Sequence, residues 1–393
     1  MMNDYQGELE EFALVVPVPV VLEKGQIHIG ERELFARIDA FSAPRLVEYH
    51  DENPCRRVLY EDFMAKAAPQ AATSNARERA ASLGVTVEAE YTVGEYDIVI
   101  LSAQESDGLE TWLHESGYRI PKGASAALRP YIRQQMKFFV AKVNLKEQRK
   151  TGVGYLRPLQ FAFESPKFML PIRLGMVNAR GSQDLIVYVI TREGRVETTN
   201  YRTVKLPSGM DLPTHVKDEF AKFYQAMFDH QVKREDMRVV FTEYFWNMGW
   251  CDPCSADPLS PAELRKLGVF WLDDAPGGAT STLAPQPIPG GPSPVMVTRL
   301  HVRYSPDTFP EDLVFQETRD QENYQARYVL RHAWQGSPEE CPAAKSYFEE
   351  LRQRRVKEAE TLAELTGWDV TDVRGKMSIE TEPARRWWEK IWD

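Results

Sequence analysis

The sequence predicts an α+β fold, with mixed, largely antiparallel sheets, several packed helices and a long C-terminal helix. Strand-like and helix-like segments follow one another in an irregular order, which favours α+β over a doubly wound α/β sheet. Hydrophobic residues make up 43% of the chain and charged residues 27%, as is usual for a globular protein. The length of 393 residues suits one large domain or two ordinary ones.

The first expected element is an extended strand at residues 12–22. Pro17 and Pro19 have no amide hydrogen for a neighbouring strand, so this strand is expected at a sheet edge or at a bulged position. Helical spacing of apolar residues predicts helices at 31–41, 106–116, 124–136, 216–229 and 343–366. Strands are expected at 85–87, 96–101, 138–143, 196–199, 238–246, 295–304, 312–315 and 328–330.

Three local patterns refine this outline. The run Leu185–Ile190 is almost entirely apolar, which predicts a central strand covered on both faces. Residues 192–195 predict a hairpin turn into the strand that begins at Val196. Ser260-Pro261-Ala262-Glu263 predicts the start of a short helix that ends at Gly268.

A segment rich in proline and glycine interrupts the pattern at residues 273–294. Such a composition indicates a linker or a long surface loop. We therefore expect an α+β region with a strand-rich centre at 1–272, and strands followed by C-terminal helices at 295–393.

Charge and hydropathy exclude several classes of partner. The net charge is −10, which argues against nucleic acid as the main partner and against general attraction to an anionic membrane. The longest apolar run, at 12–22, is shorter than the roughly 18 residues of a membrane span. We expect no nucleic-acid binding and no transmembrane segment in this chain.

The compartment depends on the N-terminus and on the cysteines. The first residues carry no basic region and no cleavage signature, so a chain that truly starts at Met1 is expected to stay in the cytoplasm. The four cysteines are Cys55, Cys251, Cys254 and Cys341. They permit two disulfides in three connectivities, and they are equally compatible with a reduced protein.

The most specific motif is Trp250-Cys251-Asp252-Pro253-Cys254, which follows an apolar strand. It resembles the thioredoxin active site, in which Cys251 would attack and Cys254 would resolve. Pro258 interrupts the helix that a thioredoxin places after this motif, so a structural disulfide or a pair of inert thiols is favoured over redox chemistry. Zinc would need a second close pair of ligands that the sequence lacks, and no metal is expected.

Other motifs are absent from the sequence or have ordinary explanations. The histidines are scattered, and no complete dinucleotide loop, phosphate loop or nucleophile elbow occurs, so we expect no cofactor. His50-Asp51-Glu52-Asn53 offers oxygen ligands without calcium-loop spacing and predicts a solvated turn.

The C-terminus is the second candidate binding region. Its candidate residues are Trp387, Trp388 and Trp392, of which Trp388 and Trp392 share a helical face with Ile391. Such a face could lie on a membrane surface. Docking on the protein's own core or on a partner is favoured, because the segment is short and the chain is acidic.

Several strings resemble an uncharacterised bacterial family, domain of unknown function 2330. They run from Phe12-Ala13-Leu14-Val15-Val16-Pro17-Val18-Pro19 through Arg299-Leu300-His301-Val302-Arg303-Tyr304 to Leu365-Thr366-Gly367-Trp368-Asp369. The Cys251 motif and the strings at 43–49, 257–259 and 309–313 belong to the same resemblance. It implies that the regions on either side of 273–294 pack as one unit. It also implies an export signal and a further strand region before this chain's start, and hence oxidised cysteines.

The leading interpretation is an exported, non-enzymatic protein that binds or scaffolds an unidentified protein or envelope partner. Cys55, Cys251, Cys254 and Cys341 are then structural. The alternative is a thiol–disulfide oxidoreductase that uses Cys251 and Cys254. A third hypothesis is an interaction module that docks through the C-terminal tryptophans.

Overall fold

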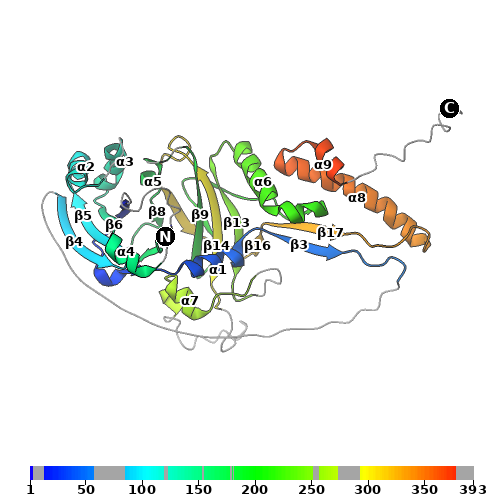
Figure 1. Cartoon of the computed structure of the whole chain (residues 1–393), viewed down its shortest axis with the longest axis horizontal. Coiled ribbons are helices and arrows are strands. Elements are labelled where there is room, and N and C mark those ends of the chain that lie inside the picture. The colour runs from blue at the N-terminus through cyan, green and yellow to red at the C-terminus, as the bar shows by residue number, and fades with distance from the viewer. Residues whose placement is uncertain are drawn as a thin grey trace.

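The computed structural model describes residues 1–2, 13–56, 85–118, 123–152, 155–177, 179, 181–250, 256–272 and 293–377. The described part is elongated, with sheets in the middle and at one end and an arm of strands and helices at the other (Figure 1). It confirms the α+β class, and most of its strand pairs are antiparallel.

The first sheet lies at the end of the molecule opposite the arm (Figure 1). Its strands, in spatial order, are β1 (Ala13–Val18), β6 (Lys137–Val143), β5 (Tyr96–Ala103) and β4 (Val85–Val93). As predicted for a strand with Pro17, β1 is at the edge among the described strands. One face is covered by α2 (Ser106–Glu115) and α3 (Ala124–Arg133), through Leu109, Leu113, Leu128 and Tyr131.

The other face of this sheet packs against a small pair of strands. They are β2 (Ile27–Ile29) and β7 (Leu159–Phe161). The 3-10 turn η2 (Lys24–Gln26) directly precedes β2. The short helices α4 (Leu145–Thr151) and α5 (Arg173–Val177) follow in the same half of the chain.

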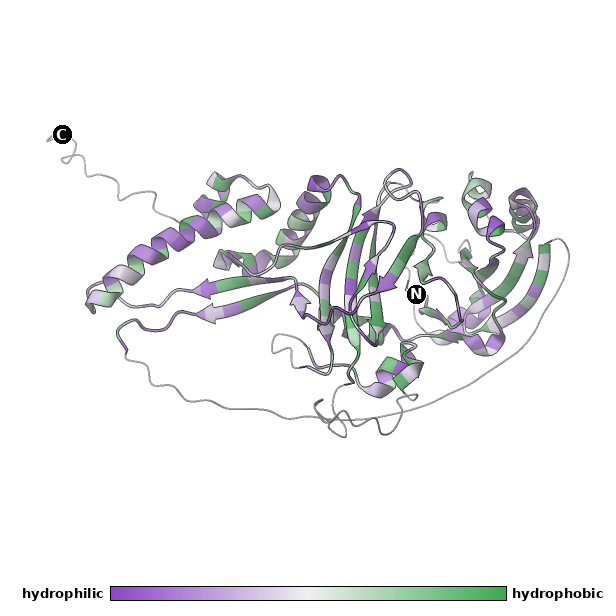
Figure 2. Cartoon of the chain, turned by 180° about the vertical axis from the view of Figure 1, so that it is seen from behind, coloured by the Kyte–Doolittle hydropathy of each residue, from purple (hydrophilic) through white to green (hydrophobic). Residues whose placement is uncertain are grey.

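The main sheet occupies the middle of the molecule. Its strands are β11 (Arg202–Lys205), β13 (Val239–Asn247), β14 (Met296–Tyr304) and β9 (Gln183–Thr191), and β16 (Tyr324–Gln325) also pairs with β13. The central strands of this sheet carry hydrophobic residues interspersed with hydrophilic ones (Figure 2). β13 and β14 come from opposite sides of residues 273–292, so both parts of the chain share one sheet.

The prediction that Leu185–Ile190 forms the central strand was wrong. β9 ends the order of described strands, whereas β13 and β14 lie inside it and are buried along almost their whole length. Ile186 in this strand is 39% exposed. An apolar run is therefore also compatible with an edge strand whose faces are covered unevenly. An apolar run therefore indicated a strand here but not its place in the sheet.

The predicted hairpin at residues 192–195 was also wrong. β10 (Val196–Thr198) leaves β9 and pairs instead with β15 (Leu313–Glu317), which in turn pairs with β8 (Met169–Leu170). A Cβ at Gly194 would overlap the carbonyl oxygens of Thr318 and Asp320, so only glycine allows this approach. The turn is thus hydrogen-bonded to the segment around Asp320. The small sheet of β10, β15 and β8 covers one face of β13 and β14.

The opposite face of the main sheet is covered by two predicted helices. α1 (Arg32–Ser42) packs there through Ile38 and Phe41, and α6 (Phe220–Arg234) packs through Phe223 and Phe228. The 3-10 turn η3 (Thr214–Glu219) precedes α6. The short helix predicted after Ser260 is confirmed as α7 (Pro261–Lys266), with Ser260 and Glu263 forming a capping box, and η4 (Phe270–Leu272) follows it.

The arm contains parallel strands and the long C-terminal helix. Its strands are β12 (Met210–Leu212), β17 (Arg327–His332) and β3 (Arg45–His50). The strands predicted at 312–315 and 328–330 are both present, in different sheets. The predicted long helix is α8 (Pro342–Thr366), followed by α9 (Val370–Lys376).

α8 begins with a proline in its first turn and ends at Gly367, which has a φ of 72°. Leu362 and Leu365 pack against α6 and the arm strands, while most of the helix surface is hydrophilic (Figure 2). The N-terminal half of α8 therefore reaches beyond the main core, where it faces the loop after β17.

Candidate functional site

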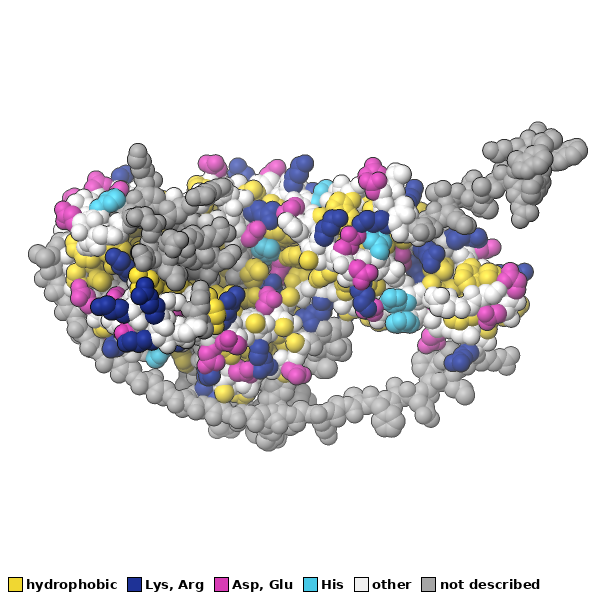
Figure 3. All heavy atoms as spheres, in the orientation of Figure 1, with side chains coloured by type: hydrophobic (Ala, Val, Ile, Leu, Met, Phe, Trp, Pro, Cys, Tyr) yellow, Lys and Arg dark blue, Asp and Glu magenta, His cyan; other side chains and the backbone are white. Residues whose placement is uncertain are grey.

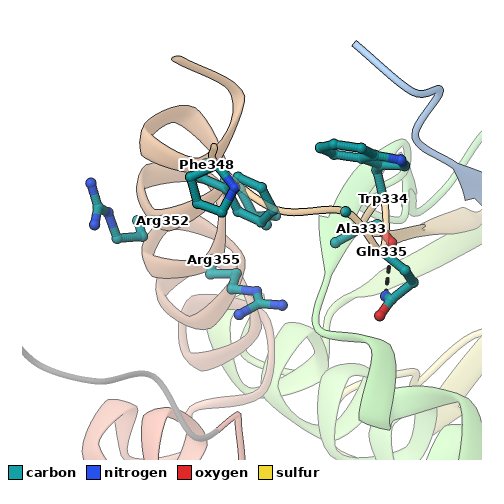
Figure 4. Close-up of a pocket in the computed structure, with 9 residues that line it drawn as sticks. Ala333, Trp334, Gln335, Phe348, Arg352 and Arg355 are labelled. Atoms are coloured by element: carbon teal, nitrogen blue, oxygen red, sulfur yellow. Dashed lines mark hydrogen bonds between the residues drawn. The ribbon is translucent and has the colours of Figure 1, made fainter. Parts of the chain in front are cut away.

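A pocket of about 380 Å³ lies between α8 and the loop that follows β17. Figure 4 shows the loop residues Trp334 and Gln335 on one side and Phe348, Arg352 and Arg355 of α8 on the other. The other lining residues are Ala333, Gly336, Pro338 and Leu351. The volume falls at the lower end of the range for small-molecule sites, and the aromatic walls are typical of them.

The aromatic wall is built from Trp334 and Phe348. Their ring centroids lie 5.9 Å apart at an interplanar angle of 40°. A Cβ at Gly336 would overlap the Trp334 ring, so glycine is needed for the indole to lie against the backbone two residues on. The loop therefore places one flat aromatic surface toward the helix.

A chain of hydrogen bonds holds this loop to the arm. The backbone N–H of Trp334 donates to the Tyr347 hydroxyl at 2.8 Å, and that hydroxyl donates to Asp51 at 2.6 Å. Arg354 donates to both carboxylate oxygens of Asp51, at 3.1 and 2.6 Å. These bonds hold the pKa of Asp51 below its ordinary value although burial opposes them.

The expectation of a solvated turn at His50-Asp51-Glu52-Asn53 was therefore wrong for Asp51. Its side chain is only 15% exposed and accepts from two residues of α8. The sequence pattern gave no sign of this, because the two partners lie 296 and 303 residues further along the chain. Asp51 fixes the strand β3 and the helix α8 to each other.

A disulfide closes the same region. Cys55 and Cys341 are bonded, with their Cα atoms 6.0 Å apart and 286 residues of sequence separation. Cys341 is the residue immediately before α8, and Cys55 follows β3 by five positions. The bridge thus joins the end of β3 to the start of the helix that forms one wall of the pocket.

Three arginines of α8 differ in their partners. Arg354 is paired with Asp51 and lies 3.4 Å from Glu358. Among the described residues, no ion pair engages Arg352 or Arg355. Figure 4 shows the Arg355 guanidinium pointing across the pocket toward the loop, whereas the Arg352 guanidinium points away and only its stem lines the pocket.

Glu358 is a buried carboxyl one turn along α8 from this site. Burial raises its pKa to about 7, although Arg354 opposes the shift. Between pH 4.5 and about 7, the Glu358 carboxyl therefore keeps its proton in the folded protein, whereas the same carboxyl in the unfolded chain has lost it. Stability should fall as the pH rises from the unfolded to the folded pKa.

We expect Glu358→Gln to remove that fall, because the amide does not ionise. The variant should be more stable than the wild type at pH 8, by on the order of 2–3 kcal/mol, and should match it near pH 4. Urea denaturation across this pH range measures the difference. Glu360→Gln, on the exposed side of the same helix, is the matched control; parallel pH curves for the Glu358 variant and this control would refute the shift.

A second group of titratable residues lies within the main sheet. Arg299, His301 and Arg303 occupy alternate positions of β14 and are directed to the face covered by α1 and α6. Glu243 lies at a register shift in β13, between Thr242 and Tyr244. This bulge brings its carboxylate between two of the cations, at 2.5 Å from Arg299 Nε and 2.7 Å from His301 Nδ1.

The network extends from Glu243 to the surface on both sides. Tyr224 of α6 donates to the carboxylate, Arg299 reaches Asp39 of α1 at 2.6 Å, and the other ring nitrogen of His301 is 3.6 Å from Asp184 of β9. Phe228 stacks on the His301 ring with centroids 3.7 Å apart. The network therefore ties α1, α6 and three strands together.

The charges in this network shift one another's pKa values. Burial would raise the pKa of Glu243, but the hydrogen bond from His301 and the charges of His301 and Arg299 hold it below its ordinary value. Burial would lower the pKa of His301, but its bonds to Asp184 and Glu243 raise it overall. The contacts within the network therefore favour the charged form of each group.

The residues singled out from the sequence have different outcomes. Cys55 and Cys341 are brought together, whereas Cys251, Cys254, Trp387, Trp388 and Trp392 lie outside the described residues. Within the described ranges, no group of three or more His, Cys, Asp or Glu side chains could hold a metal ion. None of the helices described is long and apolar enough to cross a bilayer.

Sequence reasoning missed the pocket and the buried network. The pocket forms from a loop and a helix whose apposition no local pattern reveals. The alternation of Arg299, His301 and Arg303 along a strand was a visible signal, because such a row needs buried partners if the strand is central.

Acidic and basic side chains are interspersed on the surface seen in Figure 3.

Comparisons with known proteins give one match. A family model described as an uncharacterized protein conserved in bacteria (DUF2330) matches residues 1–316. The matched part includes β3 and Cys55, while β17, Cys341 and α8 follow it. The comparisons with curated proteins and with solved structures found no match.

Proposed function

The chain belongs to the uncharacterised bacterial family DUF2330, and we propose that it is an exported, non-enzymatic binding protein of the cell envelope. Its ligand site is the pocket between α8 and residues 333–338. The observation that carries the proposal is the Cys55–Cys341 disulfide, which joins the chain after β3 to the residue before α8, the helix that forms one wall of the pocket.

The disulfide supports the proposed compartment. Disulfides persist in oxidising environments and are rare in the bacterial cytoplasm. Reduction of this bridge would release the start of α8 from β3 beside the pocket. A protein whose binding site is fastened in this way suits a location outside the cytoplasm.

The lining of the pocket supports binding without catalysis. The nine lining residues contribute aromatic and aliphatic side chains, one amide and two arginines. None of these side chains is a nucleophile or a general base near neutral pH, because arginine keeps its proton. The site can recognise a molecule by shape and charge, and the described residues that line it offer no group that would transform it.

Cell fractionation tests the proposed location. The full-length gene product, expressed from its own locus with a C-terminal tag, should leave the cell with the envelope or osmotic-shock fraction. A cytoplasmic enzyme serves as the control for leakage. Recovery of the tagged protein with that cytoplasmic marker would rule out export.

A thiol–disulfide oxidoreductase is the second candidate function. Trp250, directly before Cys251, is 66% exposed, so its ring does not pack into the core as it would over a buried structural pair. An insulin-reduction assay with the wild type and Cys251→Ser separates the two functions. A binding protein should give equal, background rates, whereas activity that the substitution abolishes would favour the enzyme.

A further inference from the structure

We infer that the pocket binds a small aromatic anion, with its ring against Trp334 and Phe348 and its anionic group on Arg355. This inference rests on the proposed binding function and specifies the class of ligand. The ligand has two features, a flat ring and a negative charge, and different residues of the pocket recognise each of them.

The flat ring follows from the aromatic wall. Trp334 and Phe348 face the same space from the loop and from α8 (Figure 4). Trp334 is held at two points, by the bond from its backbone to Tyr347 and by the contact of its ring with Gly336. A wall that is fixed before binding loses little conformational freedom when a planar group stacks on it.

The negative charge follows from Arg355. Its guanidinium points across the pocket, and among the described residues no carboxylate forms an ion pair with it. The neighbouring Arg354 differs, because its guanidinium forms an ion pair with Asp51. Five N–H donors in a planar fork match a carboxylate or a phosphate group.

The remaining lining residues select against other ligands. Among the described residues, two arginines and no acidic side chain line the pocket, so the lining favours an anion over a cation. The Gln335 amide nitrogen already donates to the Ala333 carbonyl at 3.0 Å, which leaves its oxygen toward solvent or ligand donors. An anionic aromatic molecule is the class that satisfies both the ring wall and the Arg355 guanidinium, which forms no ion pair with a described residue.

Calorimetric titration of the full chain with two matched probes tests the inference. The probes are 2-naphthoate, which carries the ring and the charge, and 2-naphthalenemethanol, which carries the ring alone. The wild type should bind 2-naphthoate about tenfold or more tightly than the alcohol, because a charge-assisted hydrogen bond is lost with the alcohol.

Two variants assign the effect to residues. Arg355→Gln should weaken 2-naphthoate binding about tenfold and leave the alcohol unchanged. Gly336→Ala should displace the Trp334 ring and weaken both probes alike. Arg319→Gln is the control for lost charge, since that side chain is 94% exposed and does not line the pocket.

The outcomes separate the inference from the proposed function. Equal binding of both probes, or an Arg355→Gln variant that matches the Arg319→Gln control, would overturn the anionic ligand while leaving a binding pocket. Binding of neither probe at millimolar concentration would overturn both the inference and the pocket's proposed role.

Discussion

Replacing Glu243 by glutamine is expected to lower the free energy of unfolding by about 3–5 kcal/mol. Glu243 is fully buried and accepts from Tyr224, Arg299 and His301. The amide keeps the size of the side chain but removes its charge, which leaves the buried side chains of Arg299 and His301 without their shared carboxylate. Breaking a buried pair from one side costs more than the pair's net contribution, because the remaining charge stays desolvated.

The pH dependence of this loss identifies the contribution of His301. Its pKa is raised in the folded protein, so the stability it contributes is complete below the unfolded value of 6.5 and disappears as the pH rises through the folded pKa. The variant loses the part of that contribution that comes from Glu243, while the bond from His301 to Asp184 remains. The difference between wild type and variant should therefore narrow at alkaline pH.

Urea denaturation of both proteins from pH 5 to pH 9 measures this difference. Glu360→Gln is the control, because it makes the same change in an exposed pair with Arg374, where about 1 kcal/mol or less is expected. A Glu243→Gln variant no less stable than this control would mean that the network contributes nothing to folding.

Loss of the Cys55–Cys341 bridge is expected to have the next largest effect. The double substitution of both cysteines by serine should lower the free energy of unfolding by about 2–4 kcal/mol, because a long loop of chain is no longer closed in the unfolded state. The strands and helix next to the bridge should also open more readily. Hydrogen exchange should therefore quicken in residues 333–341 and in the first turns of α8.

Reduced wild-type protein is the internal control for this variant. After reduction with a phosphine, the wild type should lose the same stability and show the same faster exchange as the double variant. If the double variant were as stable as the oxidised wild type, the bridge could not be what fastens the arm.

The helices were predictable because each buries one stripe of apolar side chains. Leu34, Ile38 and Phe41 repeat at helical spacing and are buried in α1, as the pattern requires. The place of a strand in its sheet was not predictable in the same way. Among the described strands, β9 with its apolar run lies at the edge of the sheet, whereas β14, which carries Arg299 and His301, lies inside it.

The polar contacts depended on features that a single segment does not encode. Glu243 meets Arg299 and His301 at a bulge in the pairing of β13 with β14. Cys55 meets Cys341 because β3 pairs in parallel with β17, so the segments that follow these two strands leave toward the same end of the arm. The sequence left three ways of pairing the four cysteines open. The bond between Cys55 and Cys341 follows only from this long-range pairing of strands.

The redox state of Cys55 and Cys341 in the living bacterium tests the proposal of an exported, disulfide-fastened binding protein most directly. Cells are quenched in acid, free thiols are alkylated, and the peptides are analysed by mass spectrometry without reduction. We predict that the linked Cys55–Cys341 peptide is the dominant form. Recovery of both cysteines as alkylated free thiols would contradict the proposal.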